Sequence, residues 1–159
     1  MSPRNHKQAG FTLVELLIVV VILAMLAAIV VPASVEVRTE SEQSAFVSEM
    51  RIFLDAATIY EAKNDGYLED SSSGAVPSGF DIHIDERGWL DGTPIGGVWD
   101  VELDSFGVKS ALGVHFQSGP AKDDAYMTQI DALIDDGDLA TGGFRRLAEG
   151  RYYYLLAES

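Results

Sequence analysis

The stretch Gly10-Phe11-Thr12-Leu13-Val14-Glu15, followed by an apolar run over residues 16–31, decides the fold of this chain. The 21 residues from position 11 to position 31 include one charged side chain, that of Glu15. As an α-helix they are about 31 Å long, which is enough to cross the hydrocarbon core of a bilayer. A carboxylate near the end of such a helix is costly unless a positive group pairs with it. The stretch therefore predicts a transmembrane helix in which Glu15 has a partner.

The composition limits the classes of function. The 159 residues leave room for one compact domain beside the apolar helix, and their net charge is −14, from 25 acidic and 11 basic side chains. A surface this acidic repels phosphate backbones and offers no basic footprint, so no nucleic-acid partner is predicted. Cysteine is absent, which excludes disulfides, thiolate nucleophiles and cysteine-ligated metal centres.

The helical pattern continues beyond the apolar run. Pro32 lacks an N–H and crowds the carbonyl of Ala28, so a kink is expected there. Apolar residues then recur on one helical face, at Phe46, Met50, Phe53, Leu54, Ala57 and Tyr60. The sequence Asn64-Asp65-Gly66 is a stop signal, with Gly66 suited to a left-handed cap. One long helix is therefore predicted from about residue 12 to residue 64.

Residues 65–97 are rich in Gly, Ser, Pro and Asp, which is typical of a surface loop with short turns. Phe80 and Trp89 are expected to fix this loop to the core. The alternating segment at residues 81–85, which contains His83, is compatible with an additional short strand.

The remainder of the chain predicts a small sheet and a second helix. Short apolar runs indicate strands over residues 98–103, 107–117, 144–148 and 151–157, the last two forming a hairpin. The second of these is expected to break near Gly113. Apolar spacing predicts a helix over residues 123–136, with Asp123 and Asp124 at its positive N-terminal end. The order of elements predicts an α+β fold, in which the long helix packs on a small antiparallel sheet.

Neither the tyrosine run nor the histidines point to catalysis. In a strand, Tyr152 and Tyr154 share one face and Tyr153 lies on the other, so a packing role is favoured. His83 and His115 follow the apolar helix without a nucleophile or a phosphate-binding loop nearby in the sequence. The chain is therefore predicted not to be an enzyme.

The N-terminus resembles type IV pilins and the related pseudopilins of type II secretion. The resemblance rests on a short basic leader, Gly10 followed by Phe11-Thr12-Leu13-Val14-Glu15-Leu16, the apolar run and Pro32. It covers about residues 3–32 and implies a pilin-like fold with a long, half-transmembrane helix on an antiparallel sheet.

The resemblance also implies a division of the chain. A leader over residues 1–10 is removed, and residues 11–64 form the long helix, of which about 11–33 is the transmembrane and assembly part. Residues 65–159, completed by helix residues 34–64, form the globular head. The head has a variable loop over 65–97 and a C-terminal sheet over 98–159.

A filament subunit is the function that the resemblance implies. A prepilin peptidase would cut between Gly10 and Phe11, Phe11 would be N-methylated, and an inner-membrane platform with an ATPase would assemble a helical homopolymer from subunits stored in lipid. Glu15 would approach the N-terminal nitrogen of a neighbouring subunit, or alternatively offset the start of its own helix. Basic leader residues predict a single-pass inner-membrane protein with its C-terminus outside, before it enters a surface pilus or a periplasmic pseudopilus. A non-polymerising, membrane-anchored binding domain is the alternative of a different class.

One cluster of acidic residues suggests a metal site. The sequence lacks the paired cysteines that hold the C-terminal region of many bacterial pilins, and major pseudopilins have a calcium site in their C-terminal loops. Asp131, Asp135, Asp136 and Asp138 surround a glycine turn and could supply oxygen ligands for calcium. The EF-hand spacing is missing, so the alternative is a solvated helix end.

Overall fold

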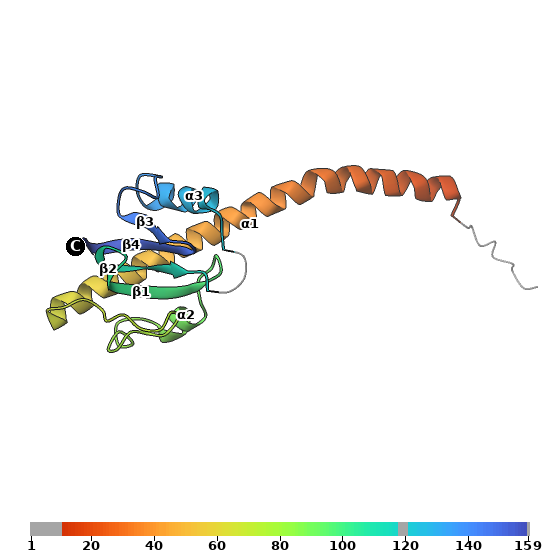
Figure 1. The fold of residues 1–159 in the computed structure, drawn as a ribbon. Helices are drawn as coiled ribbons and strands as arrows, with labels where there is room; N and C mark the ends of the chain where they lie inside the picture. Colours follow the sequence, from red (N-terminus) through yellow and green to blue (C-terminus); the bar gives the residue numbers. More distant parts are fainter. Residues whose placement is uncertain (1–10, 118–120, 159) are drawn as a thin grey trace, which may run out of the picture. The chain divides into compact units, whose positions relative to one another are not determined.

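The structure, a computed structural model, describes residues 11–117 and 121–158, apart from the side chains of residues 29–36 (Figure 1). The chain divides into two compact units, residues 1–40 and residues 41–159. Each unit is considered by itself below. The first helix, α1 (Leu13–Asn64), contributes to both.

Helix α1 confirms the prediction of one long helix, because its 52 residues run through Pro32 without a break in the helical backbone. The kink expected at Pro32 stays a prediction. In the part of the chain that the structure describes, no helix has the length and apolar character needed to cross a membrane.

The C-terminal end of α1 differs in detail from the prediction. Asp65, with a φ of 52°, takes the left-handed conformation that was expected of Gly66. The Asp65 N–H donates to the carbonyl of Glu61 at 3.0 Å. A short polar side chain tolerates this conformation, so aspartate can end a helix where glycine follows directly.

The described residues form a four-stranded antiparallel sheet in the order β1-β2-β4-β3. Its strands are β1 (Val98–Ser105), β2 (Val108–His115), β3 (Phe144–Ala148) and β4 (Arg151–Glu158). The predicted break at Gly113 is wrong, because Gly113 pairs with both Asp100 and Tyr153. A Cβ at Gly113 would clash with the carbonyl oxygen of Tyr152, so this glycine permits a close approach of two strands.

The loop between α1 and the sheet contains one short helix, α2 (Glu86–Leu90), which the sequence pattern did not predict. Asp85 caps it by accepting a hydrogen bond from the Arg87 N–H. Residues 81–84 are turns and a bend, and Asp85 is the cap of α2. The additional short strand considered for residues 81–85 is therefore not formed. Phe80 and Trp89 are buried, as predicted.

The core lies between the sheet and the part of α1 that belongs to the second unit. The predicted helical face is confirmed, since Phe46, Met50 and Phe53 are at most 4% exposed. Phe46 stacks on Trp99 of β1 with ring centroids 5.2 Å apart, and Phe53 meets the same ring edge-on at 4.9 Å. Aromatic pairs of this geometry add to the free energy gained by burial.

The remaining elements match their predicted types. Tyr152 and Tyr154 pack on the helix side of the sheet, and Tyr153 packs on the other, as strand alternation requires. The third helix, α3 (Asp124–Ile134), is capped by Asp123, which accepts a hydrogen bond from the Tyr126 N–H at 2.8 Å. The α+β fold class is therefore confirmed.

Candidate functional site

The first unit presents a continuous apolar surface along α1. Every described side chain from position 11 to position 28 is exposed. Among the large apolar ones, the exposed fraction ranges from 44% for Val21 to 81% for Leu13. An exposed apolar surface of this extent marks a site for lipid or for protein association.

Glu15 and Thr12 form a capping box at the start of this helix. The Thr12 N–H and hydroxyl both donate to Glu15 Oε2, at 2.9 and 2.8 Å, and the Glu15 N–H donates back to the Thr12 hydroxyl at 3.2 Å. The Thr12 carbonyl accepts the first helical bond, from the Leu16 N–H at 3.2 Å. The capping box satisfies N–H groups that a helix start otherwise leaves unpaired.

The capping box places the Glu15 carboxylate at the start of its own helix, a position compatible with the second interpretation of the sequence. The pairing of Glu15 with a neighbouring subunit stays a prediction. Among the described residues, the second carboxylate oxygen, Oε1, accepts no hydrogen bond, so the group retains an acceptor for a further partner. Thr12 was missed as a functional residue, although threonine three positions before glutamate is the sequence signature of this cap.

The other residues predicted for this region are placed only in part. Phe11 precedes the capping box and is 77% exposed. An α-amino group at Phe11 would therefore lie one residue before the helix cap. Gly10 and the rest of the leader lie outside the described residues.

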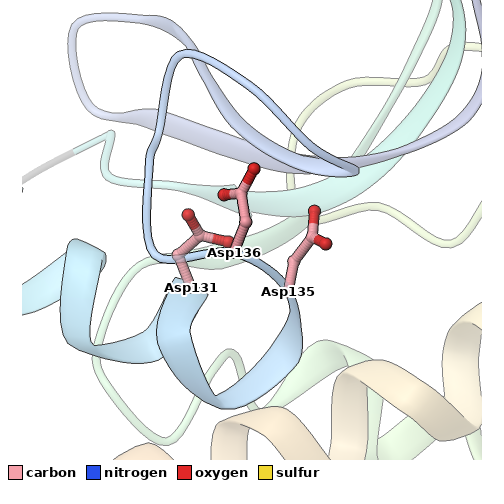
Figure 2. A group of neighbouring side chains, drawn as sticks. All are labelled: Asp131, Asp135 and Asp136. Carbon is pink, nitrogen blue, oxygen red and sulfur yellow. The ribbon is translucent and has the colours of Figure 1, made fainter.

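The structure brings together three of the four aspartates predicted to bind calcium (Figure 2). Asp131 lies in the last turn of α3, and Asp135 and Asp136 follow the end of that helix. One carboxylate oxygen from each lies within 4.8 Å of the others. Asp138 is not in this group, and its Oδ1 accepts from the Ala140 N–H at 3.0 Å.

Asp131 has the most unusual environment of the three. It is fully buried, and neither of its carboxylate oxygens has a hydrogen-bond partner among the described residues. Burial, followed by the charges of Asp136 and Asp135, raises the pKa of Asp131 to about 6. A buried carboxylate without donors is unfavourable unless a cation or a proton joins it.

Asp135 and Asp136 are exposed and hold the loop that leads to β3. Asp135 accepts from the Gly143 N–H. Asp136 accepts from the Asp138 N–H at 2.9 Å and from the Thr141 hydroxyl at 2.8 Å, and these bonds lower its pKa. The solvated-helix-end interpretation therefore suits these two residues but not Asp131. A carboxylate-only ligand set suits a hard cation such as calcium.

Comparison with known proteins finds one family model and several relatives. Residues 5–31 match the family described as the prokaryotic N-terminal methylation motif. The chain is 34% identical over 64 residues to the type II secretion system core protein G of Aeromonas hydrophila, covering 40% of this chain and 45% of that protein. It is 36% identical over 68 residues to the type IV major pilin protein PilA of Myxococcus xanthus, covering 43% of this chain and 30% of that protein.

The core protein G of Vibrio cholerae is 38% identical over 64 residues, covering 40% of this chain and 44% of that protein. The alignments thus span less than half the length of each of these curated relatives. No solved structure matches the chain.

Proposed function

We propose that this chain is a structural subunit of a type IV pilus-like filament, polymerised through the first part of α1, because it has the N-terminal methylation motif and is similar to a type IV pilin and to type II secretion pseudopilins. The role is structural rather than catalytic. The observation that carries the proposal is Glu15, an acidic side chain that begins a continuously exposed apolar helix.

Maturation supplies the partner that Glu15 needs. Cleavage between Gly10 and Phe11 by a prepilin peptidase leaves an α-amino group on Phe11, and methylation keeps it an amine. The reference pKa of an α-amino group is roughly 8, so such a group is positively charged at neutral pH in water. In an assembled filament, the amine of one subunit pairs with Glu15 of its neighbour. Oε1 is available for that bond while Oε2 stays on Thr12.

In this proposal, the first part of α1 is surrounded by lipid before assembly and by other subunits after it. Before assembly, the apolar surface of the first unit is covered by lipid in the inner membrane, with the C-terminus outside. A platform with an ATPase then moves subunits from lipid into the filament, where copies of the same helix cover one another. The apolar contacts are similar in both states, so the Glu15–amine pair favours the filament.

Two alternatives use the same N-terminal region. In a type II secretion pseudopilin, the polymer is a short periplasmic fibre, and the relatives include proteins of both kinds. A non-polymerising anchor would need neither a cleavage site nor Glu15. The filament proposal therefore accounts for more of the sequence.

Substitution of Glu15 tests the proposal in cells that carry the assembly machinery. Glu15→Val should leave cleavage intact and greatly reduce the amount of chain in sheared fibres. Glu40→Val, an exposed acidic position on the same helix, is the matched control and should assemble normally. Fibres of normal abundance from Glu15→Val would contradict the pairing. Gly10→Val should keep the leader attached, and a mature-sized product would move the cleavage site elsewhere.

We also propose that Asp131, Asp135 and Asp136 bind a calcium ion. The environment of Asp131 supports this, because a cation would provide the partner that its buried oxygens lack. Calorimetry of the full chain in detergent should detect binding of calcium, and saturating calcium should raise the melting temperature by several degrees. Asp131→Asn should abolish both effects, whereas Asp138→Asn should retain them. Equal heat from Asp131→Asn and the unmodified protein would place the ion elsewhere.

A further inference from the structure

The loop before α2 contains a segment held between two apolar anchors. Leu68, 1% exposed, and Pro77 are both buried in the head. Between them, the chain turns back at residues 71–75, a segment that we call the strap. Within this turn, the Ser71 hydroxyl donates to the Ala75 carbonyl at 3.2 Å, and the Ala75 N–H donates to the Ser72 carbonyl at 2.8 Å.

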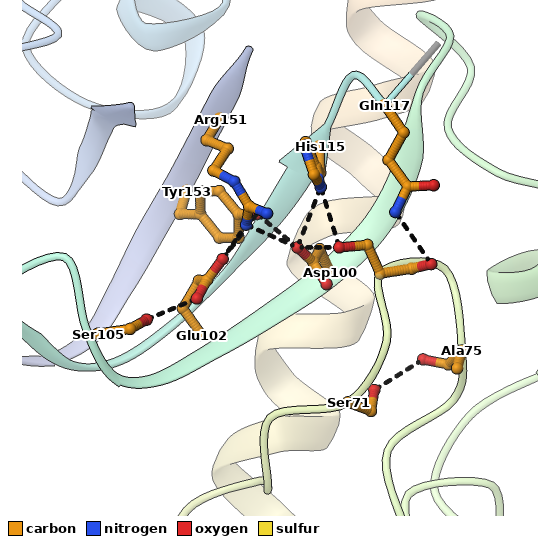
Figure 3. A network of polar contacts seen from close by, with 10 residues as sticks. Ser71, Ala75, Asp100, Glu102, Ser105, His115, Gln117, Arg151 and Tyr153 are labelled. Atoms are coloured by element: carbon orange, nitrogen blue, oxygen red, sulfur yellow. Dashed lines mark hydrogen bonds and ion pairs between the residues drawn. The ribbon is translucent and has the colours of Figure 1, made fainter. Parts of the chain in front are cut away.

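Hydrogen bonds fasten the strap to the edge of the sheet (Figure 3). The Gly74 N–H donates to the carbonyl of Trp99 in β1 at 3.0 Å. The Ser73 hydroxyl donates to Asp100 Oδ2 at 2.9 Å and lies 2.9 Å from Nδ1 of His115. The Gln117 amide donates to the Ser73 carbonyl at 3.3 Å. On the other side, the Trp89 indole N–H donates to the carbonyl of Ala75 at 3.1 Å.

The strap adjoins a buried ionic cluster on the face of the sheet away from α1. Asp100 and Glu102 are 3% and 4% exposed, and both bind the guanidinium of Arg151. The Tyr153 hydroxyl donates to Asp100 Oδ2 at 2.7 Å, and the Ser105 hydroxyl donates to Glu102 at 2.5 Å. Two carboxylates thus contact one guanidinium, and the hydroxyl groups of Ser73, Ser105 and Tyr153 donate hydrogen bonds to them.

His115 lies beside the same cluster, with its Nδ1 3.6 Å from Asp100 Oδ2. Burial and the nearby charge of Arg151 lower its pKa, despite the opposing effects of Asp100 and Glu102. The closed strap lies against Asp100, and the hydration that this carboxylate loses offsets much of what the hydrogen bonds gain. Opening would return water to Asp100.

We propose that the strap opens locally, exposing Asp100 of the Asp100–Glu102–Arg151 cluster to water while the sheet and α1 stay folded. Segments with few buried apolar contacts open at a lower free energy than core strands. The strap is thus a conformational device that varies how far Asp100 is exposed on the face of the sheet away from α1. This inference does not depend on polymerisation or on calcium.

Amide hydrogen exchange of the full chain in detergent tests the proposal. The Gly74 N–H should exchange at least about 100-fold faster than the amide of Leu112, which lies at the centre of the sheet. Its exchange should also be insensitive to low urea concentrations, because a local opening exposes little surface. Exchange of Gly74 and Leu112 at one rate and with one urea dependence would overturn the local opening.

Two serine variants distinguish local opening of the strap from global unfolding of the head. Ser73→Ala removes a bond to a charged group and should speed exchange at Gly74 by about 10-fold, with Leu112 unchanged. Ser72→Ala, at an exposed neighbouring position, is the matched control and should behave as the unmodified protein. Equal acceleration of Gly74 and Leu112 by Ser73→Ala would show that the network acts through global unfolding, which contradicts the proposal.

Discussion

The two units of the chain use the same helix in opposite ways. In residues 41–159, apolar side chains of α1 such as Phe46 and Met50 are fully buried against the sheet. In residues 1–40, every described side chain from position 11 to position 28 is exposed. A helix with one apolar stripe can be completed by its own domain, whereas a helix that is apolar all around needs a surface from outside the chain.

Charge separates the two units as sharply as burial does. Residues 1–40 contain three basic and three acidic side chains, so they carry no net charge. Residues 41–159 contain 8 basic and 22 acidic side chains, so the whole net charge of −14 lies there. The uncharged first unit is therefore suited to apolar contacts, and the acidic second unit is suited to contact with water.

The largest expected difference between the units concerns removal of a large apolar side chain. Phe53→Ala should lower the free energy of unfolding of the head by about 3–5 kcal/mol, because its ring packs on Trp89 and Trp99. Leu23→Ala, on the exposed part of α1, should leave that free energy unchanged. Urea unfolding in detergent, followed by tryptophan fluorescence, measures both. A similar loss from the two variants would show that the units do not unfold independently.

A smaller loss is expected from adding one methyl group to the sheet. Gly113→Ala should destabilise the head by about 1–3 kcal/mol, since the new Cβ would meet the backbone of β4. Gly66→Ala, where a Cβ has room, is the control and should be close to neutral. Thermal unfolding of the two variants measures the difference. An equally neutral Gly113→Ala would show that the sheet relaxes around the added methyl group.

Periodicity explains which parts of the fold could be predicted from the sequence. The helical face from Phe46 to Tyr60 and the alternation of Tyr152 and Tyr153 follow from local geometry alone. The five residues of α2 are too few for a periodic signal. Gly113 suggested a break because the sequence does not show that another backbone lies against it.

The candidate sites also differ in whether neighbouring residues in the sequence are enough to predict them. The Thr12–Glu15 capping box is readable as a pattern of neighbouring residues. The burial of Asp131, by contrast, depends on how α3 and the following loop pack. The contacts among Asp100, Arg151 and Tyr153 depend on the register of three strands, which no local pattern contains.

A modest effect on the first unit alone is expected from the capping box. Thr12→Val removes the hydroxyl that bonds Glu15 and should destabilise the first turn of α1 by about 1 kcal/mol. Amide exchange in that turn should therefore be several-fold faster in detergent, and unfolding of the head should not change. Thr12→Ser keeps the hydroxyl and should restore slow exchange. Unaltered exchange in Thr12→Val would show that lipid or detergent, rather than the cap, holds the helix start.

The smallest effect is on the head alone and follows from His115. Its pKa is lowered in the folded state, by burial first and then by Arg151, so the unfolded chain takes up the proton first as the pH falls. Stability should therefore decline as the pH drops below about 6.5, until the folded state is protonated as well. His115→Asn should lose less stability than the unmodified protein between about pH 7.5 and pH 5.5 in urea unfolding. His83→Asn keeps His115 and should retain the full decline, so equal pH profiles for all three proteins would remove His115 as the cause.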